Sequence, residues 1–360
     1  MVVSHVSDAL IIQSRDGPYT VHFDAGIPDL STFLESPSHY LIDANVARLY
    51  RSDLGPLIDH PCAVLIDATE DSKSINNLIP IFERLVGQGI RRDHTLVAVG
   101  GGVIQDICCF IASTLLRGLP WRFIPTTLLA QADSCIGSKS SINLRQTKNI
   151  LGTFKAPEDV FVAARFLDTL EPREISSGIG EILKVHAIDG ADSFDRLASD
   201  YDLLRRDRTI LEKYIRSALC IKRRYIEEDE FDRGPRNIFN YGHTFGHAIE
   251  SATSFAIPHG IAVSMGMDIA NYVAVDRSLI SREHYGRMHR TLRRNYAEFA
   301  GVPIPLAGMF SALMKDKKNT NSSLGLILPT GDDASIRRVM VAPDQVFRSQ
   351  CADALAGIRE

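Results

Sequence analysis

Three histidines offer the clearest chemistry in this chain. His243 and His247 lie four residues apart, and His259 follows directly before Gly260. A spacing of four places two side chains on one face of a helix, and neutral imidazole is the commonest protein ligand for zinc-like ions. Because a His-x-x-x-His pair also occurs on helices by chance, two alternatives stay open: a metal site, or an ordinary polar helix face.

A second candidate site is the run Gly100-Gly101-Gly102, which ends an apolar strand pattern and opens a helical one. Glycines let the backbone approach a phosphate, and the free N–H groups of a helix N-terminus bind anions. The run does not complete a Gly-x-Gly-x-x-Gly fingerprint, because Gln105 occupies the last position. A phosphate-binding turn and a tight turn without a ligand are therefore both possible.

The elements that would position these residues change character along the chain. In the first half, short apolar runs typical of strands alternate with helical patterns, the strands at 39–43, 63–67, 96–99 and 122–125 and the helices at 74–88 and 103–117. This alternation predicts a parallel sheet with helices on its faces. From about residue 171 helical periods dominate, at 174–188, 208–228, 243–255, 261–274 and 282–299, before a strand signal at 324–328.

We therefore predict an α/β protein of two domains. The length of 360 residues exceeds the size at which one core usually stops growing. The first domain, residues 1–170, is expected to be an α/β domain with a parallel sheet, and the second, residues 171–360, to be mainly α-helical. An interface between two such domains is a preferred place for a ligand cleft.

Bulk composition excludes several classes of function. The formal net charge of −4 gives no indication of nucleic-acid binding. No apolar run approaches the length of a membrane span. The N-terminus lacks the pattern of a signal peptide. The six cysteines show no paired motif, so reduced thiols and a cytoplasmic location are expected.

Several ordered blocks of residues together point to a family. They run through residues 100–106, Arg117-Gly118, 124–134, Lys139, Lys148-Asn149, 180–184, 236–240, 242–247 and His259-Gly260. In this order and spacing the chain resembles the 3-dehydroquinate synthase family, within the sugar phosphate cyclase superfamily. The resemblance covers about residues 39–320. It implies a Rossmann-like NAD-binding first domain and a helical second domain that binds a divalent metal, zinc or cobalt.

The resemblance divides the histidines between two roles. It implies Glu181, His243 and His259 as metal ligands, while His247 would face the substrate phosphate. One carboxylate and two imidazoles leave coordination positions open for substrate oxygens, as a catalytic site needs.

The resemblance also implies a cofactor site for NAD. Its residues come mainly from the ends of the expected strands and the loops that follow them. They are Asp43, Asn45, Glu70, Lys73, Gly101, Gly102, Val103, Asp106, Thr126, Thr127, Leu129, Lys148, Phe166, Thr169, Leu170 and Glu174. A carboxylate such as Asp43 at a strand end suits a ribose hydroxyl pair, although a plain cap of the next helix is the alternative.

On the substrate side the resemblance implies many cations, which would neutralise a phosphate and a carboxylate. The expected catalytic residues are Lys139, Lys184, His247, Asn240 and Asp133. The expected substrate-binding residues are Arg117, Lys148, Asn149, Lys222, Arg236, Lys317 and Lys318, of which one of the last two would serve. In the family the arginine matching Arg117 reaches across a subunit interface, so a homodimer is implied.

The implied reaction converts 3-deoxy-arabino-heptulosonate 7-phosphate into 3-dehydroquinate and phosphate, a step of the shikimate pathway toward aromatic amino acids. NAD would oxidise an alcohol and later return the hydride, while the metal would polarise the oxygen. Between these steps phosphate would leave by elimination.

Four features depart from the common family pattern. Gln105 and Ser138 each stand where a Gly is usual, the stretch 140–143 is varied, and Ile261 replaces a Glu after the His-Gly pair. That Glu is expected to support a metal ligand, so its loss would weaken metal binding or mark another substrate. Against this, Lys222 and Arg236 are both present and favour an acidic substrate.

Three other functions remain as alternatives. A divergent cyclase of a secondary-metabolite or surface-sugar pathway would act on another heptulose phosphate. An iron-dependent alcohol dehydrogenase would share the two-domain plan but release NADH. A binding protein that kept the fold would release no phosphate at all.

Overall fold

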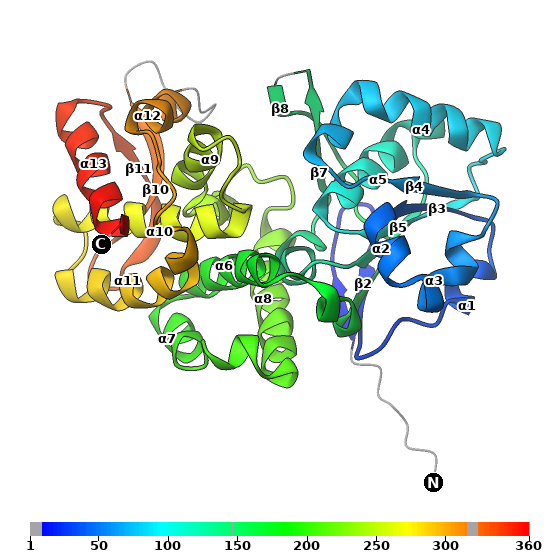
Figure 1. Ribbon diagram of the computed structural model, residues 1–360, viewed down its shortest axis with the longest axis horizontal. Coiled ribbons are helices and arrows are strands. Elements are labelled where there is room, and N and C mark those ends of the chain that lie inside the picture. The colour runs from blue at the N-terminus through cyan, green and yellow to red at the C-terminus, as the bar shows by residue number, and fades with distance from the viewer. Residues whose placement is uncertain (1–8, 146, 315–322, 360) are drawn as a thin grey trace, which may run out of the picture. The chain divides into compact units, whose positions relative to one another are not determined.

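A computed structural model describes residues 9–145, 147–314 and 323–359. Within these ranges, no helix combines the length and apolar character needed to cross a membrane. The chain divides into two compact units (Figure 1). The first comprises Met1–Leu170 with Arg223–Asp232, and the second comprises Glu171–Lys222 with Arg233–Glu360.

The segment 223–232, which we expected in the second domain, groups instead with the first unit. The reason is local hydrogen bonding. Glu227 accepts from the backbone N–H of Gln13 at 3.0 Å, and Glu230 accepts from that of Arg15 at 2.8 Å. These contacts hold the end of helix α8 (Arg208–Glu228) against the N-terminal strands.

The first unit is built on a seven-stranded sheet of order β1-β2-β9-β6-β5-β3-β4. All neighbours are parallel except β1 and β2. The strands are β1 (Ala9–Ile12), β2 (Tyr19–Asp24), β3 (Ser38–Asp43), β4 (Ala63–Ile66), β5 (Thr95–Gly100), β6 (Trp121–Pro125) and β9 (Asp159–Ala163). Strand β4 lies on one side of β3, whereas β5 and then β6 lie on its other side. The direction in which strands are added therefore reverses, which creates a switch point between β3 and β5. Open α/β sheets bind ligands at such a point.

Helices cover both faces of this sheet, with α2 and α3 on one side and α4 and α5 on the other (Figure 1). The core below α2 and α3 includes Tyr40, Ile42 and Val97, all nearly inaccessible to solvent. The helices of this unit are α1 (Ser31–Leu34), α2 (Ala44–Leu49), α3 (Arg51–Ile58), η1 (Glu70–Lys73), α4 (Ile75–Gly87), α5 (Gly102–Thr114), η2 (Leu115–Arg117), the π-helical turn η3 (Ala130–Ser134) and η4 (Ala164–Thr169).

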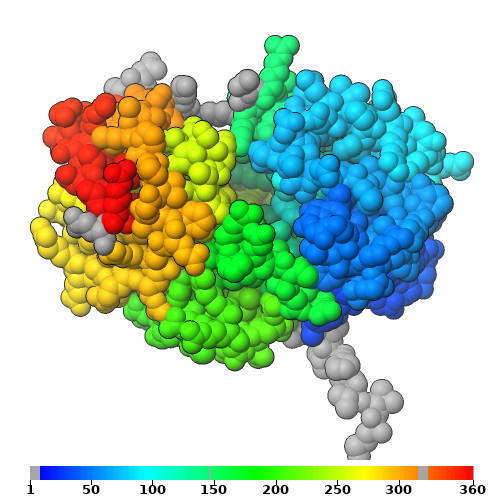
Figure 2. Space-filling model, in the orientation of Figure 1, coloured from blue at the N-terminus to red at the C-terminus, as the bar shows by residue number. Residues whose placement is uncertain are grey.

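A hairpin of β7 (Lys139–Leu144) and β8 (Thr147–Phe154) completes the first unit and stands out from its surface (Figure 2). Most of β8 is exposed.

The second unit is mainly helical and is organised around α10 (His259–Asp276), most of whose side chains are buried. Helices α6, α9, α11 and α13 pack against it, together with a two-stranded sheet. The other elements are α6 (Pro172–Asp189), α7 (Ala191–Ser199), η5 (Leu203–Arg205), η6 (Pro235–Asn240), α9 (His243–Ala252), α11 (Arg282–Tyr296), η7 (Ala297–Phe299), α12 (Leu306–Met314), β10 (Leu324–Thr330), β11 (Ser335–Val341) and α13 (Gln345–Arg359).

The predicted fold class is confirmed: a sheet dominated by parallel strands is followed by a mainly helical part. Strands β1, β2, β9 and β11 and the β7–β8 hairpin were not predicted from the sequence. Strand β1 is only four residues long, and β8 is too exposed to show an apolar run. Neither gives the alternation on which a strand prediction depends.

Candidate active site

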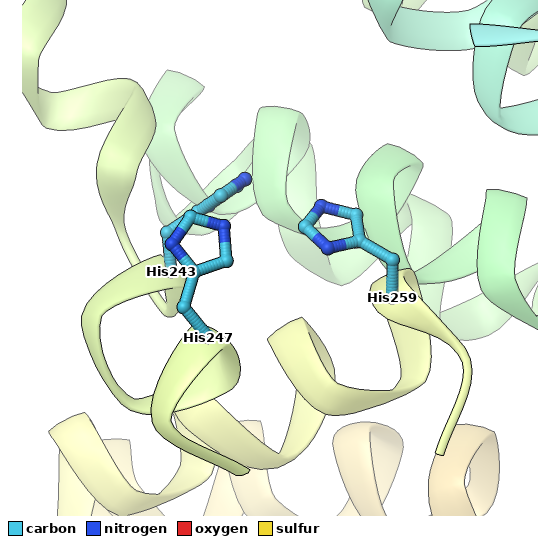
Figure 3. Close-up of side chains that lie close together, drawn as sticks. All are labelled: His243, His247 and His259. Carbon is cyan, nitrogen blue, oxygen red and sulfur yellow. The ribbon is translucent and has the colours of Figure 1, made fainter. Parts of the chain in front are cut away.

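The three histidines come together at the N-terminal ends of two helices in the second unit (Figure 3). His243 is the first residue of α9, His247 lies one turn along it, and His259 is the first residue of α10. Their potential ligand atoms all lie within 4.8 Å of one another. His243 and His259 are half-buried, while His247 is exposed.

A buried carboxylate from α6 completes this cluster. Glu181 Oε1 lies 3.3 Å from His259 Nε2 and 3.8 Å from His243 Nε2, and the side chain is only 1% exposed. Zinc bonds of about 2.0–2.2 Å in tetrahedral geometry separate ligand atoms by roughly 3.3–3.6 Å. The 3.3 Å separation falls in this range and the 3.8 Å separation lies just above it, so the position of Glu181 relative to the two histidines is close to that expected around a zinc ion.

Two further charged side chains surround the cluster. Lys184, one turn along α6 and also buried, places Nζ 2.5 Å from Glu181 Oε2. Glu250 on α9 places Oε2 3.2 Å from His259 Nδ1. Burial alone lowers the pKa of His259, but hydrogen bonds to Glu181 and Glu250 outweigh it and raise this pKa to about 10. The two carboxylates thus place negative charge on both sides of the His259 ring.

Glycines allow the helices that carry these side chains to approach closely. A Cβ on Gly260 would lie 1.8 Å from the carbonyl oxygen of Ser177, and one on Gly180 would lie 2.0 Å from that of Gly260. The Gly260 N–H also donates to Ser177 Oγ at 2.9 Å. This crossing of α6 and α10 brings Glu181 beside His259.

Most of the residues expected to bind NAD in the first unit lie at one edge of the sheet, whereas Lys148 lies on β8 of the hairpin. Parallel strands end at the same edge, and the residues at this edge lie at or after the carboxyl ends of five of them. Asp43 ends β3 and Asn45 follows it, Glu70 and Lys73 follow β4, Gly101, Gly102, Val103 and Asp106 follow β5, Thr126, Thr127 and Leu129 follow β6, and Phe166 and Thr169 follow β9. Leu170 and Glu174 flank the start of α6.

The glycine-rich turn is closely packed at its centre and open at its end. A Cβ on Gly101 would lie 2.8 Å from Thr127 Cγ2, whereas one on Gly102 would meet only Ser134 Oγ, at 3.9 Å. Gly101 stands at the N-cap of α5, where no side-chain cap is formed. Such a helix start suits the phosphates of a dinucleotide.

Lys73 ties the expected cofactor residues to the expected substrate residues of the first unit. Its buried Nζ lies 2.7 Å from Asp106 Oδ2 and 3.9 Å from Glu70 Oε1, and donates to Asn149 Oδ1 at 3.2 Å. Burial raises the pKa of Asp106, and the nearby Lys73 ammonium opposes this shift. Lys148 Nζ lies 3.8 Å from the same Glu70 oxygen.

Some of the expected side chains have structural contacts. Phe166 is buried in the core and Thr169 shares a hydrogen bond of 3.1 Å with the Tyr50 hydroxyl. Asp43 caps α2 by accepting from the Asn45 N–H at 2.8 Å, which is the alternative we gave for it. The residue is half-buried, so part of it still reaches solvent.

The remaining substrate-side residues are spread over both units. Lys139 forms an ion pair with Asp232, and exposed Arg117 lies in a left-handed turn with φ of +70°. Asp133 lies in η3, Lys222 on α8, and Arg236 and Asn240 in η6, and the side chains of Lys222 and Arg236 are buried. Lys317 and Lys318 fall outside the described residues.

Glu250 and Asp232 were not predicted as site residues from the sequence. Glu250 lies seven residues after His243 and three after His247, on the same face of α9. Helical spacing could therefore have found it. Asp232 lies in an irregular segment after α8, where no periodicity relates it to Lys139.

Two departures from the family pattern have a clear structural setting. Gln105 is buried, and its amide donates to the Ser134 carbonyl oxygen at 2.5 Å while its own oxygen accepts from Ser134 Oγ at 2.6 Å. It thereby joins α5 to η3, the turn that carries Asp133. Ile261 is fully buried on α10.

Comparisons with known proteins agree with this arrangement. Residues 63–177 match the family model described as 3-dehydroquinate synthase N-terminal, and residues 178–319 match the one described as 3-dehydroquinate synthase C-terminal. A 3-dehydroquinate synthase of Alkaliphilus metalliredigens is 32% identical over 346 residues, which cover 94% of this chain and 97% of that protein.

Two solved structures share the fold. A 2-epi-5-epi-valiolone synthase from Streptomyces hygroscopicus subsp. jinggangensis, with NAD+ and Zn2+ bound, has a TM-score of 0.79 and 26% identity, and the match covers 94% of this chain and 96% of that one. A 2-deoxy-scyllo-inosose synthase complexed with carbaglucose-6-phosphate, NAD+ and Co2+ has a TM-score of 0.80 and 23% identity, with 96% and 99% covered.

The fold and the relatives of this chain place it in the class of the sugar phosphate cyclases. Within this class, the chain belongs to the 3-dehydroquinate synthase family. The predicted family and the predicted enzyme class, a phosphate-eliminating cyclase among the carbon–oxygen lyases, are thereby confirmed.

Proposed function

We propose that this protein is a 3-dehydroquinate synthase that converts 3-deoxy-arabino-heptulosonate 7-phosphate into 3-dehydroquinate and phosphate. The observation that carries the proposal is the cluster of Glu181, His243 and His259, with its separations of 3.3 and 3.8 Å. The curated relatives of this chain, matched over 90–97% of their lengths in several cases, support this reaction.

In this proposal Glu181, His243 and His259 hold a divalent metal ion, zinc or cobalt. When bound, the metal acts as a Lewis acid toward a substrate oxygen. Lys184, held by Glu181 and placed 5.7 Å from the centre of the Phe239 ring, keeps an ammonium in the same buried region. A fixed positive charge of this kind stabilises oxygen anions that develop during a reaction.

NAD is assigned to the carboxyl edge of the first unit's sheet. The open start of α5 at Gly102 suits its phosphates, and the partly exposed Asp43 carboxylate suits a ribose. NAD supplies hydride removal and return when bound. The buried Lys73–Asp106 pair at 2.7 Å holds the loops of this edge in place, so the cofactor meets a preformed site.

Recognition of an acidic substrate is assigned to Arg236 and Lys222, which would hold its carboxylate. Asn240 and Asp133 would hold hydroxyls, and the exposed His247 would contact the phosphate. Replacing Arg236 by Ala should raise KM for a carboxylate substrate much more than for a neutral sugar phosphate. Equal effects on both substrates would show that Arg236 does not recognise the carboxylate.

A second candidate is a cyclase that acts on another heptulose phosphate. It is favoured by Ile261, where the family pattern has a Glu, and by the solved relatives, a 2-epi-5-epi-valiolone synthase and a 2-deoxy-scyllo-inosose synthase. The experiment that distinguishes the two candidates measures phosphate release from 3-deoxy-arabino-heptulosonate 7-phosphate and from sedoheptulose 7-phosphate and identifies the product.

We expect phosphate release from the heptulosonate without net NADH. Release from sedoheptulose phosphate alone would support the second candidate. Accumulation of NADH would indicate an iron-dependent alcohol dehydrogenase instead, and no release from either substrate would indicate a binding protein.

We also propose a homodimer. Arg117 is exposed at the end of η2, next to Gly118, and its left-handed backbone projects it from a tight turn. Sedimentation equilibrium should give twice the mass of the chain, and the monomer mass at micromolar concentration would contradict the proposal.

A further inference from the structure

Ile261 stands where the family pattern has a Glu, and the loss of that Glu was expected to weaken metal binding or to mark another substrate. The structure gives a different setting. Ile261 lies two residues after His259 on α10, which corresponds to about 200° around the helix, and it is fully buried in the core. A side chain at this position therefore faces away from the His259 ring.

Glu250 contacts that ring from another helix. Its Oε2 lies 3.2 Å from His259 Nδ1, while Glu181 Oε1 lies 3.3 Å from Nε2 on the opposite side. The Glu250 side chain is 13% exposed. His259 is therefore held between two carboxylates, one from α9 and one from α6.

We propose that Glu250 is the residue that positions His259 for metal binding, and that position 261 has no part in it. The proposal rests on the proposed function, in which the cluster binds a divalent metal. When His259 donates its Nδ1–H to Glu250, the Nε2 lone pair is left directed toward His243 and Glu181. A carboxylate on the second nitrogen of a ligating histidine fixes its tautomer and orientation and increases its basicity.

The test compares Glu250→Gln and Glu250→Ala with the parent enzyme. Gln keeps the shape but removes the charge, and Ala removes the contact. After metal removal by a chelator, each protein is titrated with Co2+, whose visible absorption reports coordination geometry. We expect Kd for Co2+ to rise about 10- to 100-fold in both variants, with altered absorption bands.

A matched control removes a carboxylate charge elsewhere in the same unit. Glu298 is exposed in η7, so Glu298→Gln should leave Kd for Co2+ within about two-fold of the parent value. A purely structural role for Glu250 would lower the unfolding temperature without changing the absorption bands. A thermal-shift titration with Co2+ measures the affinity even for a variant of reduced stability.

The outcomes separate this inference from the proposed function. If the parent binds Co2+, His243→Ala does not, and both Glu250 variants bind within two-fold of the parent, only the role of Glu250 is wrong. If His243→Ala binds Co2+ as tightly as the parent does, the proposed metal site itself is wrong.

Discussion

The histidine cluster of the second unit and the glycine-rich edge of the first unit use opposite means to make a site. The cluster depends on side chains of particular chemical types, brought together by helices α6, α9 and α10. The edge depends on backbone at the ends of parallel strands, with few side chains that are chemically demanding. The difference predicts that the cluster loses metal binding when a donor side chain is removed. The edge should instead lose NAD binding when a glycine is replaced by a larger residue.

The largest effect is expected from Glu181→Gln. It removes a proposed metal ligand and leaves the buried Lys184 ammonium without the carboxylate 2.5 Å away. We expect loss of metal binding and turnover, together with destabilisation of about 3–5 kcal/mol, because an uncompensated buried charge is costly. Metal titration and denaturant unfolding measure the two effects separately.

A double variant tests the physical reason. Glu181→Gln with Lys184→Met removes both charges, so stability should recover while metal binding stays lost. If the double variant is as unstable as the single one, the buried charge is not the cause.

The next effect concerns the spacing of helices behind the cluster. Gly260→Ala would place a methyl group 1.8 Å from the Ser177 carbonyl oxygen, so α6 and α10 must move apart. We expect a loss of stability of about 1–3 kcal/mol, as for other overpacked cores, and weaker metal binding because Glu181 and His259 separate.

Gly286→Ala provides the matched control for this change. Gly286 lies inside α11, and a Cβ there would have no neighbour within 4 Å. Because Ala favours a helix, stability should rise by about 0.5–1 kcal/mol, with metal affinity unchanged. Equal stability losses in the two variants would rule out the close helix crossing as the cause.

A smaller and more selective effect is expected at the sheet edge. Gly101→Ala would bring a methyl group 2.8 Å from Thr127 Cγ2, and the turn must shift to relieve this contact. We expect Kd for NAD to rise about ten-fold or more, roughly 1.4 kcal/mol, because the phosphates lose backbone contacts. Fluorescence titration with NADH and Co2+ titration together measure the selectivity. Weakened Co2+ binding with unchanged NADH binding would reverse the comparison between the two regions.

The two regions also differ in how far the sequence could predict them. The spacing of His243 and His247, and the position of His259 at a helix start, predicted a shared site, and the structure brings all three within 4.8 Å. Spacing could not relate them to Glu181, because that contact depends on how α6 crosses α9 and α10, whereas Glu250 shares the helical face of His243 and His247 and was overlooked. The resemblance to a family supplied Glu181, and its ligand role stays a prediction.

At the sheet edge, the alternation of strands and helices was enough to predict a parallel sheet and a turn at its carboxyl end. The network around Lys73 was not predictable from periodicity, because its members come from η1, α5 and the exposed hairpin. Asp232 beside Lys139 was missed for the same reason. Contacts between irregular segments follow from tertiary packing, which local patterns do not encode.

The smallest expected effect comes from a second histidine–carboxylate contact, between His289 of α11 and Asp268 of α10. His289 Nδ1 lies 2.8 Å from the buried Asp268 Oδ2, which also accepts from the Tyr296 hydroxyl at 2.5 Å. The hydrogen bond to Asp268 raises the pKa of His289. The folded state therefore binds this proton more tightly than the unfolded state, so the stabilisation is complete below about pH 6.5 and is lost as pH rises through the raised pKa.

Because His289 lies partly at the surface, we expect this contact to contribute about 1 kcal/mol or less to the free energy of unfolding. The contribution is measured as the difference in urea unfolding between the parent and His289→Gln at pH 6 and pH 8.5. Metal affinity should not differ between these two proteins at either pH. If it does, the two histidine–carboxylate contacts of α10 are coupled, and the metal cluster extends further along the helix than its four closest side chains.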